Sequence, residues 1–237
     1  MSTGNEQPSE WFASAALHWP ANVTNFTDKL AAAQRIAARV TDRSLIGIGS
    51  GSATYLALYA IGERVRRESL AIRIATTSYE TETAAYTLGI PTVPLGSVRP
   101  EWGVDGADEV DPRGRLIKGR GGAMFMEKIL WSTCQKMYLA IDPTKHVERL
   151  GQGFPIPIEV DRHAVDLVGR ALDAHGSSRW SLRLAGGGKD GPIVTEWGNL
   201  VIDAWFDQIP DGLHAQLKAL PGVIETGLFE GFSFEII

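Results

Sequence analysis

Cysteine is almost absent from this chain, because Cys134 is the single one among 237 residues. A lone cysteine excludes an intramolecular disulfide framework and a cysteine-rich metal cluster. It falls within an apolar helical pattern, which favours a small core residue over a nucleophile. The five histidines form no pair at the spacing of zinc ligands, so we expect no metal site.

The chain also lacks long apolar runs and an excess of positive charge. No run approaches the roughly 18 apolar residues that a membrane helix requires, which predicts no membrane partner. Residues 1–22 have no basic start followed by an apolar core, so we interpret them as an N-terminal extension and expect a cytoplasmic location. A formal net charge of -5 with scattered basic residues indicates no nucleic-acid partner.

Apolar residues make up 44% of the chain, enough for a substantial core. In the first part, strand-like and helix-like segments alternate. We expect helices at 27–39, 52–69, 79–89 and 123–136, and strands at 44–48, 70–78, 92–95, 102–104, 116–118 and 137–142. This alternation predicts an α/β fold with a mainly parallel, Rossmann-like sheet flanked by helices.

The pattern changes after residue 150. Strands are expected at 154–160, 181–185, 193–197 and 200–206, helices at 163–176 and 211–220, and a hairpin-type turn at 186–191. We therefore predict a catalytic α/β domain at 23–150 and a smaller, inserted α+β domain at 151–232. The last strand, 233–237, is expected to return to the first sheet.

A glycine-rich turn at 47–52 joins the first strand to a helix. Such a turn presents unpaired backbone N–H groups and the positive end of the helix dipole, which suit a phosphate. Ser50 and Ser52 add hydroxyl donors. The dinucleotide fingerprint fails at its third glycine, and residues 76–78 are Thr, Thr and Ser, which bind a ligand or cap the next helix. The turn therefore favours a small phosphorylated ligand over NAD.

The segment 102–128 concentrates ionisable groups beside glycines. It holds Asp105, Asp108, Lys118 and Glu127, and folding gains little from charges next to flexible backbone. Moving a proton next to a carbonyl requires a base and an electrophile that stabilises the enediolate oxygen, and a carboxylate with a lysine supplies both. We interpret the segment as a reaction centre, the alternative being a solvated face or a capping acid.

Several motifs follow one another in order along most of the chain. They are GIGSGSA at 47–53, DGADEVD at 105–111, LIKGRGGA at 116–123 with MEK at 126–128, AIDPTKHVERLG at 140–151, FPIPIEV at 154–160, TEWGNLVID at 195–203 and PGVIETGLF at 221–229. Together they resemble ribose-5-phosphate isomerase of the A type. DGADEVD followed by the glycine turn and Glu-Lys is the most specific part.

The resemblance implies an aldose–ketose isomerase that interconverts ribose 5-phosphate and ribulose 5-phosphate without a metal or organic cofactor. Glu127 resembles the base that moves a proton between C2 and C1. Asp105, Asp108 and Lys118 resemble the groups that open the sugar ring and stabilise the enediolate. Candidate substrate and phosphate contacts are Lys29, Ser50, Gly51, Ser52, Gly106, Ala107, Gly119, Gly121 and Lys145. A homodimer or homotetramer is also implied.

Two departures leave alternatives open. Ala53 stands where threonine is usual in the family, and Arg120 interrupts the glycine run. An isomerase of another phosphorylated sugar is therefore a second hypothesis. A non-catalytic sugar-phosphate sensor is a third, although the 22 residues ahead of the fold leave no room for a helix-turn-helix.

Overall fold

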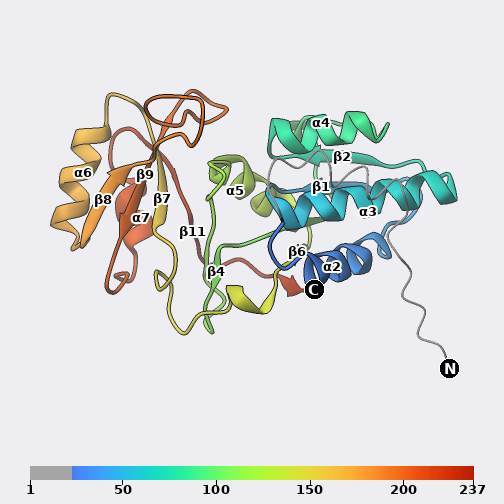
Figure 1. Cartoon of the computed structure of the whole chain (residues 1–237), viewed down its shortest axis with the longest axis horizontal. Coiled ribbons are helices and arrows are strands. Elements are labelled where there is room, and N and C mark those ends of the chain that lie inside the picture. Colours follow the sequence, from blue (N-terminus) through green and yellow to red (C-terminus); the bar gives the residue numbers. More distant parts are fainter. Residues whose placement is uncertain (1–22) are drawn as a thin grey trace.

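The computed structural model describes residues 23–237, so the predicted extension at 1–22 lies outside the described residues. The largest sheet has five parallel strands in the order β12-β6-β3-β1-β2 (Figure 1). They are β1 (Leu45–Ile48), β2 (Arg73–Thr76), β3 (Trp102–Asp105), β6 (Met137–Leu139) and β12 (Glu235–Ile236), with the helices α2 (Phe26–Ala37), α3 (Ser52–Glu68), α4 (Tyr79–Thr87) and α5 (Met124–Thr133). The predicted α/β fold with a parallel sheet flanked by helices is confirmed.

Successive side chains of β1 point to opposite faces of this sheet, and the two faces differ. Ile46 and Ile48 are fully buried in one core with apolar residues of α2 and α3. Gly47, between them, points to the opposite face, where an added Cβ would lie 2.4 Å from Leu130 of α5. The missing side chain lets α5 lie directly on the sheet. This close packing places the helix that carries Glu127.

A second, antiparallel sheet lies at the other end of the molecule (Figure 1), with its strands in the order β10-β7-β9-β8. Its elements are β7 (Ile156–Val160), β8 (Arg179–Leu182), β9 (Leu200–Trp205), β10 (Val223–Thr226), α6 (Val165–Ala174) and α7 (Leu213–Lys218). It has an apolar core of its own. Within 23–237, no helix combines the length and the apolar character needed to cross a membrane.

Three short strands form a third sheet between the two larger ones (Figure 1). They are β4 (Glu109–Val110), β5 (Leu116–Ile117) and β11 (Leu228–Phe229), and two short 3-10 helices lie at Leu95–Ser97 and Pro143–Lys145. Because β11 follows β10 directly and pairs with β5, the chain passes through this small sheet on its way back to β12. The domain boundaries after residues 150 and 232 stay a prediction.

The strand predicted at 92–95 is wrong. This segment makes only a single parallel bridge, between Ile74 of β2 and Thr92. Pro91 and Pro94 flank the bridge, and a proline has no N–H with which to extend a ladder. The edge of the sheet therefore ends in a bridge rather than a sixth strand.

The strand predicted at 193–197 is also wrong. The backbone N–H of Thr195 donates to the carbonyl of Asn199 (2.8 Å), which closes a turn. The hydroxyl of Thr195 donates to the buried carboxylate of Glu159 (2.7 Å), and such side-chain bonds compete with a strand ladder. The strands β4, β10 and β11 were not predicted from the sequence, because no alternation of apolar and polar residues marks these segments.

Candidate active site

One pocket of about 310 Å³ lies at the carboxyl ends of the parallel strands. It is lined by residues of the first lobe, which is built on the five-stranded parallel sheet, and of the smaller lobe, which is built on the antiparallel sheet. The structure brings every predicted site residue except Asp105 to its wall: Lys29, Ser50, Gly51, Ser52, Gly106, Ala107, Asp108, Lys118, Gly119, Gly121, Glu127 and Lys145. Asp105 is fully buried behind the wall. Within 23–237, no three His, Cys, Asp or Glu side chains are grouped to hold a metal ion.

Lys118 lies at the centre of the charged groups. Its ammonium is 2.9 Å from the Asp105 carboxylate and 3.2 Å from that of Glu127, and it donates to the carbonyl of Gly106 (2.5 Å). Burial disfavours the charged ammonium, but attraction to Asp105 and Glu127 outweighs burial and raises the pKa of Lys118. The pocket therefore contains a buried, protonated lysine.

Asp105 contacts Lys118 from the side that faces away from the pocket. One oxygen of Asp105 accepts from the backbone N–H of Gly106 (2.8 Å), and the other accepts from the indole N–H of Trp131 (2.8 Å). The Asp105 side chain fits only because residue 49 is glycine, since an added Cβ there would lie 2.2 Å from its Oδ1. Asp105, the last residue of β3, is thus placed to orient Lys118.

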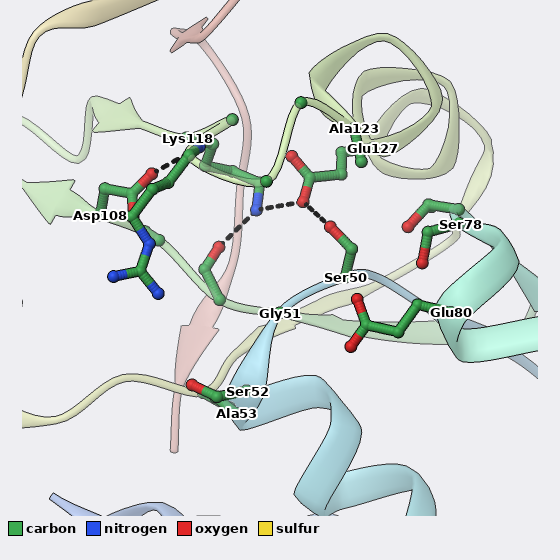
Figure 2. A pocket seen from close by; sticks show the side chains of 18 of the residues that line it. Ser50, Gly51, Ser52, Ala53, Ser78, Glu80, Asp108, Lys118, Ala123 and Glu127 are labelled. Atoms are coloured by element: carbon green, nitrogen blue, oxygen red, sulfur yellow. Dashed lines mark hydrogen bonds and ion pairs between the residues drawn. The ribbon is translucent and has the colours of Figure 1, made fainter. Parts of the chain in front are cut away.

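The two carboxylate oxygens of Glu127 differ in their hydrogen-bond partners. Its Oε1 accepts from the Ser50 hydroxyl (2.6 Å) and pairs with Lys118 (Figure 2). Its Oε2 is buried and has no hydrogen-bond partner among residues 23–237. Burial, together with the charge of Asp105, raises the pKa of Glu127 to about 7 against the opposing effects of Lys118 and Ser50. A carboxyl of that kind is suited to exchange a proton near neutral pH.

Cations gather at another end of the pocket. The Lys29 ammonium donates to the Ser52 hydroxyl (3.3 Å) at the start of α3. Burial, and then the like charges of Lys145 and Arg120, lower the pKa of Lys29, although Asp142 at 4.0 Å opposes them. The N-terminus of α3 adds its partial positive charge. This end is suited to a phosphate.

Asp108 completes the wall on the side of the glycine turn. Its Oδ2 accepts from the backbone N–H of Arg120 (3.1 Å), and its Oδ1 lies 3.9 Å from the Arg120 guanidinium. Asp108 is therefore tied to the turn rather than to Lys118. The two aspartates of the motif have separate surroundings.

Two further wall residues, Thr77 and Asp142, were not among the candidate substrate and phosphate contacts, although Thr77 belongs to the segment 76–78 that was expected to bind a ligand or cap a helix. The Thr77 hydroxyl and one oxygen of Asp142 are buried and have no hydrogen-bond partner in the described part of the chain. The neighbouring Ser78 caps α4 by accepting from the N–H of Thr81, so capping explains Ser78 but not Thr77. The position of Thr77 at a strand's carboxyl end was the available signal.

The smaller lobe also contributes to the wall, through residues 193–197. The Glu196 carboxylate accepts from the backbone N–H of Tyr79 at the start of α4 (2.8 Å). The Trp197 ring packs edge-on against Phe125 of α5, with the ring centres 6.1 Å apart. No local pattern in the sequence predicts these contacts, because they join segments far apart in the chain.

Comparison with known proteins gives consistent matches. A family model described as ribose 5-phosphate isomerase A (phosphoriboisomerase A) matches residues 73–237. A ribose-5-phosphate isomerase A from Thermosynechococcus vestitus is 42% identical over 205 residues, covering 85% of this chain and 86% of the relative. A solved ribose 5-phosphate isomerase A from Methanocaldococcus jannaschii superposes with a TM-score of 0.84 at 36% identity, covering 88% of this chain and 92% of that one. A solved D-ribose-5-phosphate isomerase in complex with phospho-erythronic acid has a TM-score of 0.81 at 38% identity, covering 86% of this chain and 90% of that one.

Proposed function

Because the chain belongs to the ribose 5-phosphate isomerase A family of isomerases, we propose that it interconverts D-ribose 5-phosphate and D-ribulose 5-phosphate through an enediolate, with Glu127 as the base. The observation that carries this proposal is the unpartnered, buried Oε2 of Glu127 on the pocket wall. A buried carboxylate oxygen without a partner is unfavourable unless a ligand atom satisfies it. A substrate C–H beside a carbonyl supplies a proton for it.

The reaction needs one proton carrier and one positive charge. Glu127 removes the proton from C2 of the open-chain aldose, and the electron pair of the broken C–H bond forms the C1–C2 double bond while O1 becomes negative. Lys118 stabilises that oxygen. Glu127 then returns the proton to C1, the O2 hydroxyl gives its proton to O1, and the ketose carbonyl forms at C2. Ser50 keeps Oε1 of Glu127 fixed during both transfers.

The phosphate is expected at the cationic end. Lys29, Lys145 and the hydroxyl of Ser52 lie there beside the N-terminus of α3. Phospho-erythronic acid, the ligand of the similar solved structure, carries a phosphate and a carboxylate. A ligand with these two anionic groups matches a pocket with cations at one end and Lys118 at the other.

The test measures isomerisation together with solvent exchange. Wild type is incubated with ribose 5-phosphate in deuterated buffer, and we expect ribulose 5-phosphate with deuterium at C1. Glu127→Gln is expected to lower kcat by roughly 100- to 10,000-fold, the usual contribution of general acid–base catalysis. The matched control is Glu82→Gln, which removes a carboxylate outside the pocket wall.

Four results would contradict the proposal. A wild-type rate in Glu127→Gln excludes this base, and ketose formed without solvent deuterium argues against a proton exchanged at Glu127. Turnover of another pentose phosphate in place of ribose 5-phosphate would favour the alternative suggested by Ala53 and Arg120. Tight binding without turnover would favour a sensor.

We also propose a homodimer or homotetramer that acts in the cytoplasm. The family resemblance supports this assembly. Light scattering after gel filtration measures the mass, and a mass of 25.7 kDa, that of one chain, would exclude it.

A further inference from the structure

A partly buried ion pair of Arg183 and Asp203 links the second sheet to the glycine turn of the pocket. Arg183, which follows β8, donates from Nε to the Asp203 carboxylate (2.8 Å), and its Nη2 also binds that carboxylate. Its Nη1 donates to the carbonyls of Gly119 (2.9 Å) and Arg120 (2.7 Å). The guanidinium thus uses one edge for Asp203 and the opposite edge for the glycine turn, a fork geometry that lysine does not provide.

The turn held by Arg183 spans Gly119–Gly122. Gly119 and Gly122 have positive φ angles of 98° and 84°, and the N–H of Gly122 closes the turn on the carbonyl of Gly119 (3.0 Å). Gly119 directly follows Lys118, and the turn leads into α5. Its orientation therefore affects the stretch between the two proposed catalytic groups.

The carbonyl contacts of the turn also determine where its backbone N–H groups point. The peptide bonds of residues 23–237 are trans, so each carbonyl points opposite to the N–H of the next residue. With the Gly119 carbonyl on Arg183, the N–H of Arg120 points the other way, where it reaches Asp108 (3.1 Å). With the Arg120 carbonyl on Arg183, the N–H of Gly121 also points away from Arg183. In the described chain it has no acceptor, and Gly121 lines the pocket.

We propose that Arg183 and Asp203 are positioning residues, which orient the Gly119–Gly122 turn so that the N–H of Gly121 donates to a substrate oxygen in the pocket. The proposal deepens the proposed isomerase function and rests on it. Asp203 fixes the guanidinium, and the guanidinium fixes two carbonyls. The backbone donor is then in place before the negative oxygen develops, as electrostatic stabilisation requires.

A purely structural role for the pair makes a different prediction. The lobes are also joined by Lys128, whose ammonium donates to the Glu225 carboxylate and to the carbonyls of Thr226 and Leu228, each at 2.8 Å. Loss of Arg183 therefore leaves α5 tied to the second sheet. A change in the turn should appear in catalysis more than in the unfolding temperature.

The experiment uses the full chain. Arg183→Gln alone leaves Asp203 half enclosed without its cation, so the main variant is R183Q/D203N, in which no unpaired charge remains. The matched control is Arg179→Gln. Arg179 begins β8, the strand that precedes Arg183, and its guanidinium lies over the Trp205 ring, 4.0 Å from the ring centre. We measure kcat and KM for ribose 5-phosphate, the unfolding temperature, and amide hydrogen exchange of the peptide covering 119–123.

The expected result is a split between the two kinetic constants. In R183Q/D203N, kcat falls roughly 10- to 100-fold, as for a misplaced catalytic contact, while KM changes less. Exchange of the 119–123 amides becomes faster than in wild type and in R179Q. Added guanidinium ion raises the kcat of Arg183→Ala, which a role in stability alone does not predict.

The outcomes separate this inference from the function on which it rests. An inactive wild type refutes the proposed function. In that case hydrogen exchange still tests the positioning role, and an unchanged exchange rate at 119–123 in R183Q/D203N refutes it. An active wild type with equal kcat in R183Q/D203N overturns the inference alone. Equal losses of kcat in R179Q and in R183Q/D203N also overturn it.

Discussion

The pH dependence of kcat/KM is expected to report the titration of Glu127. Burial raises the pKa of this carboxyl to about 7, because the charged form loses its hydration in the pocket. Only the deprotonated form accepts a proton from the substrate, so activity should rise with pH. An ordinary glutamate, with a pKa of about 4.3, would be fully ionised throughout this range.

The size of the change follows from the pKa. With a pKa of about 7, about one eleventh of Glu127 is ionised at pH 6 and about ten elevenths at pH 8, so kcat/KM should rise about tenfold between them. The assay follows ketose formation from ribose 5-phosphate at low substrate concentration. The substrate phosphate also titrates, with a pKa of about 6, so the wild-type profile alone does not assign the limb.

The variant Ser50→Ala shows whether the acid limb of the profile belongs to Glu127 or to the substrate phosphate. The Ser50 hydroxyl donates to the ionised Glu127 (2.6 Å) and so lowers the pKa of that carboxyl. Its removal should raise the pKa and move the acid limb to higher pH, whereas titration of the substrate phosphate would leave the limb in place. A limb at the same pH in wild type and Ser50→Ala, or a flat profile from pH 6 to 8, would refute the reasoning.

Three further predictions concern space and charge. Gly49→Ala places a Cβ 2.2 Å from Oδ1 of Asp105, so kcat should fall at least about tenfold as that carboxylate is displaced; a wild-type kcat would contradict the packing. Lys29→Met removes a cation from the end of the pocket that is proposed to bind the phosphate. It should raise KM by about tenfold or more with a smaller change in kcat, and an unchanged KM would contradict this position for the phosphate. Gly169→Ala puts a Cβ 2.1 Å from the Trp180 ring, so calorimetry should show destabilisation of about 1–3 kcal/mol with kcat preserved, and an unchanged unfolding temperature would contradict it.

Much of the first lobe is predictable because its signals are local. The apolar run ending at Ile48, the glycines of the 47–52 turn and the helix after it are neighbours in the chain, so a strand, a turn and a helix follow from a short window. Glu127 was expected in the first turns of a helix behind a glycine loop, and it lies in the first turn of α5. That these segments meet in one pocket follows from the parallel topology.

The rest depends on contacts between distant segments. Thr195 reads as part of a strand, but its hydroxyl bonds to Glu159, which is 36 residues earlier in the chain. Arg183 binds carbonyls 63 and 64 residues earlier, and a carbonyl acceptor leaves no trace in the side-chain pattern. Asp105 was expected in the loop facing the substrate, yet it ends β3 and lies behind Lys118, because glycine at 49 leaves room there.

The position of β12 bears on how the protein is made. β12 pairs with β6, and Glu235 forms ion pairs with Arg39 (2.9 Å) and with Lys136 (2.7 Å), the second across 99 residues of chain. During synthesis, the edge of β6 therefore stays uncovered until the whole smaller lobe has left the ribosome. An uncovered parallel edge is prone to pair with other chains, and distant pairings form slowly. Fusions that hinder residues 235–236 should reduce the yield of folded protein even though the pocket lies elsewhere.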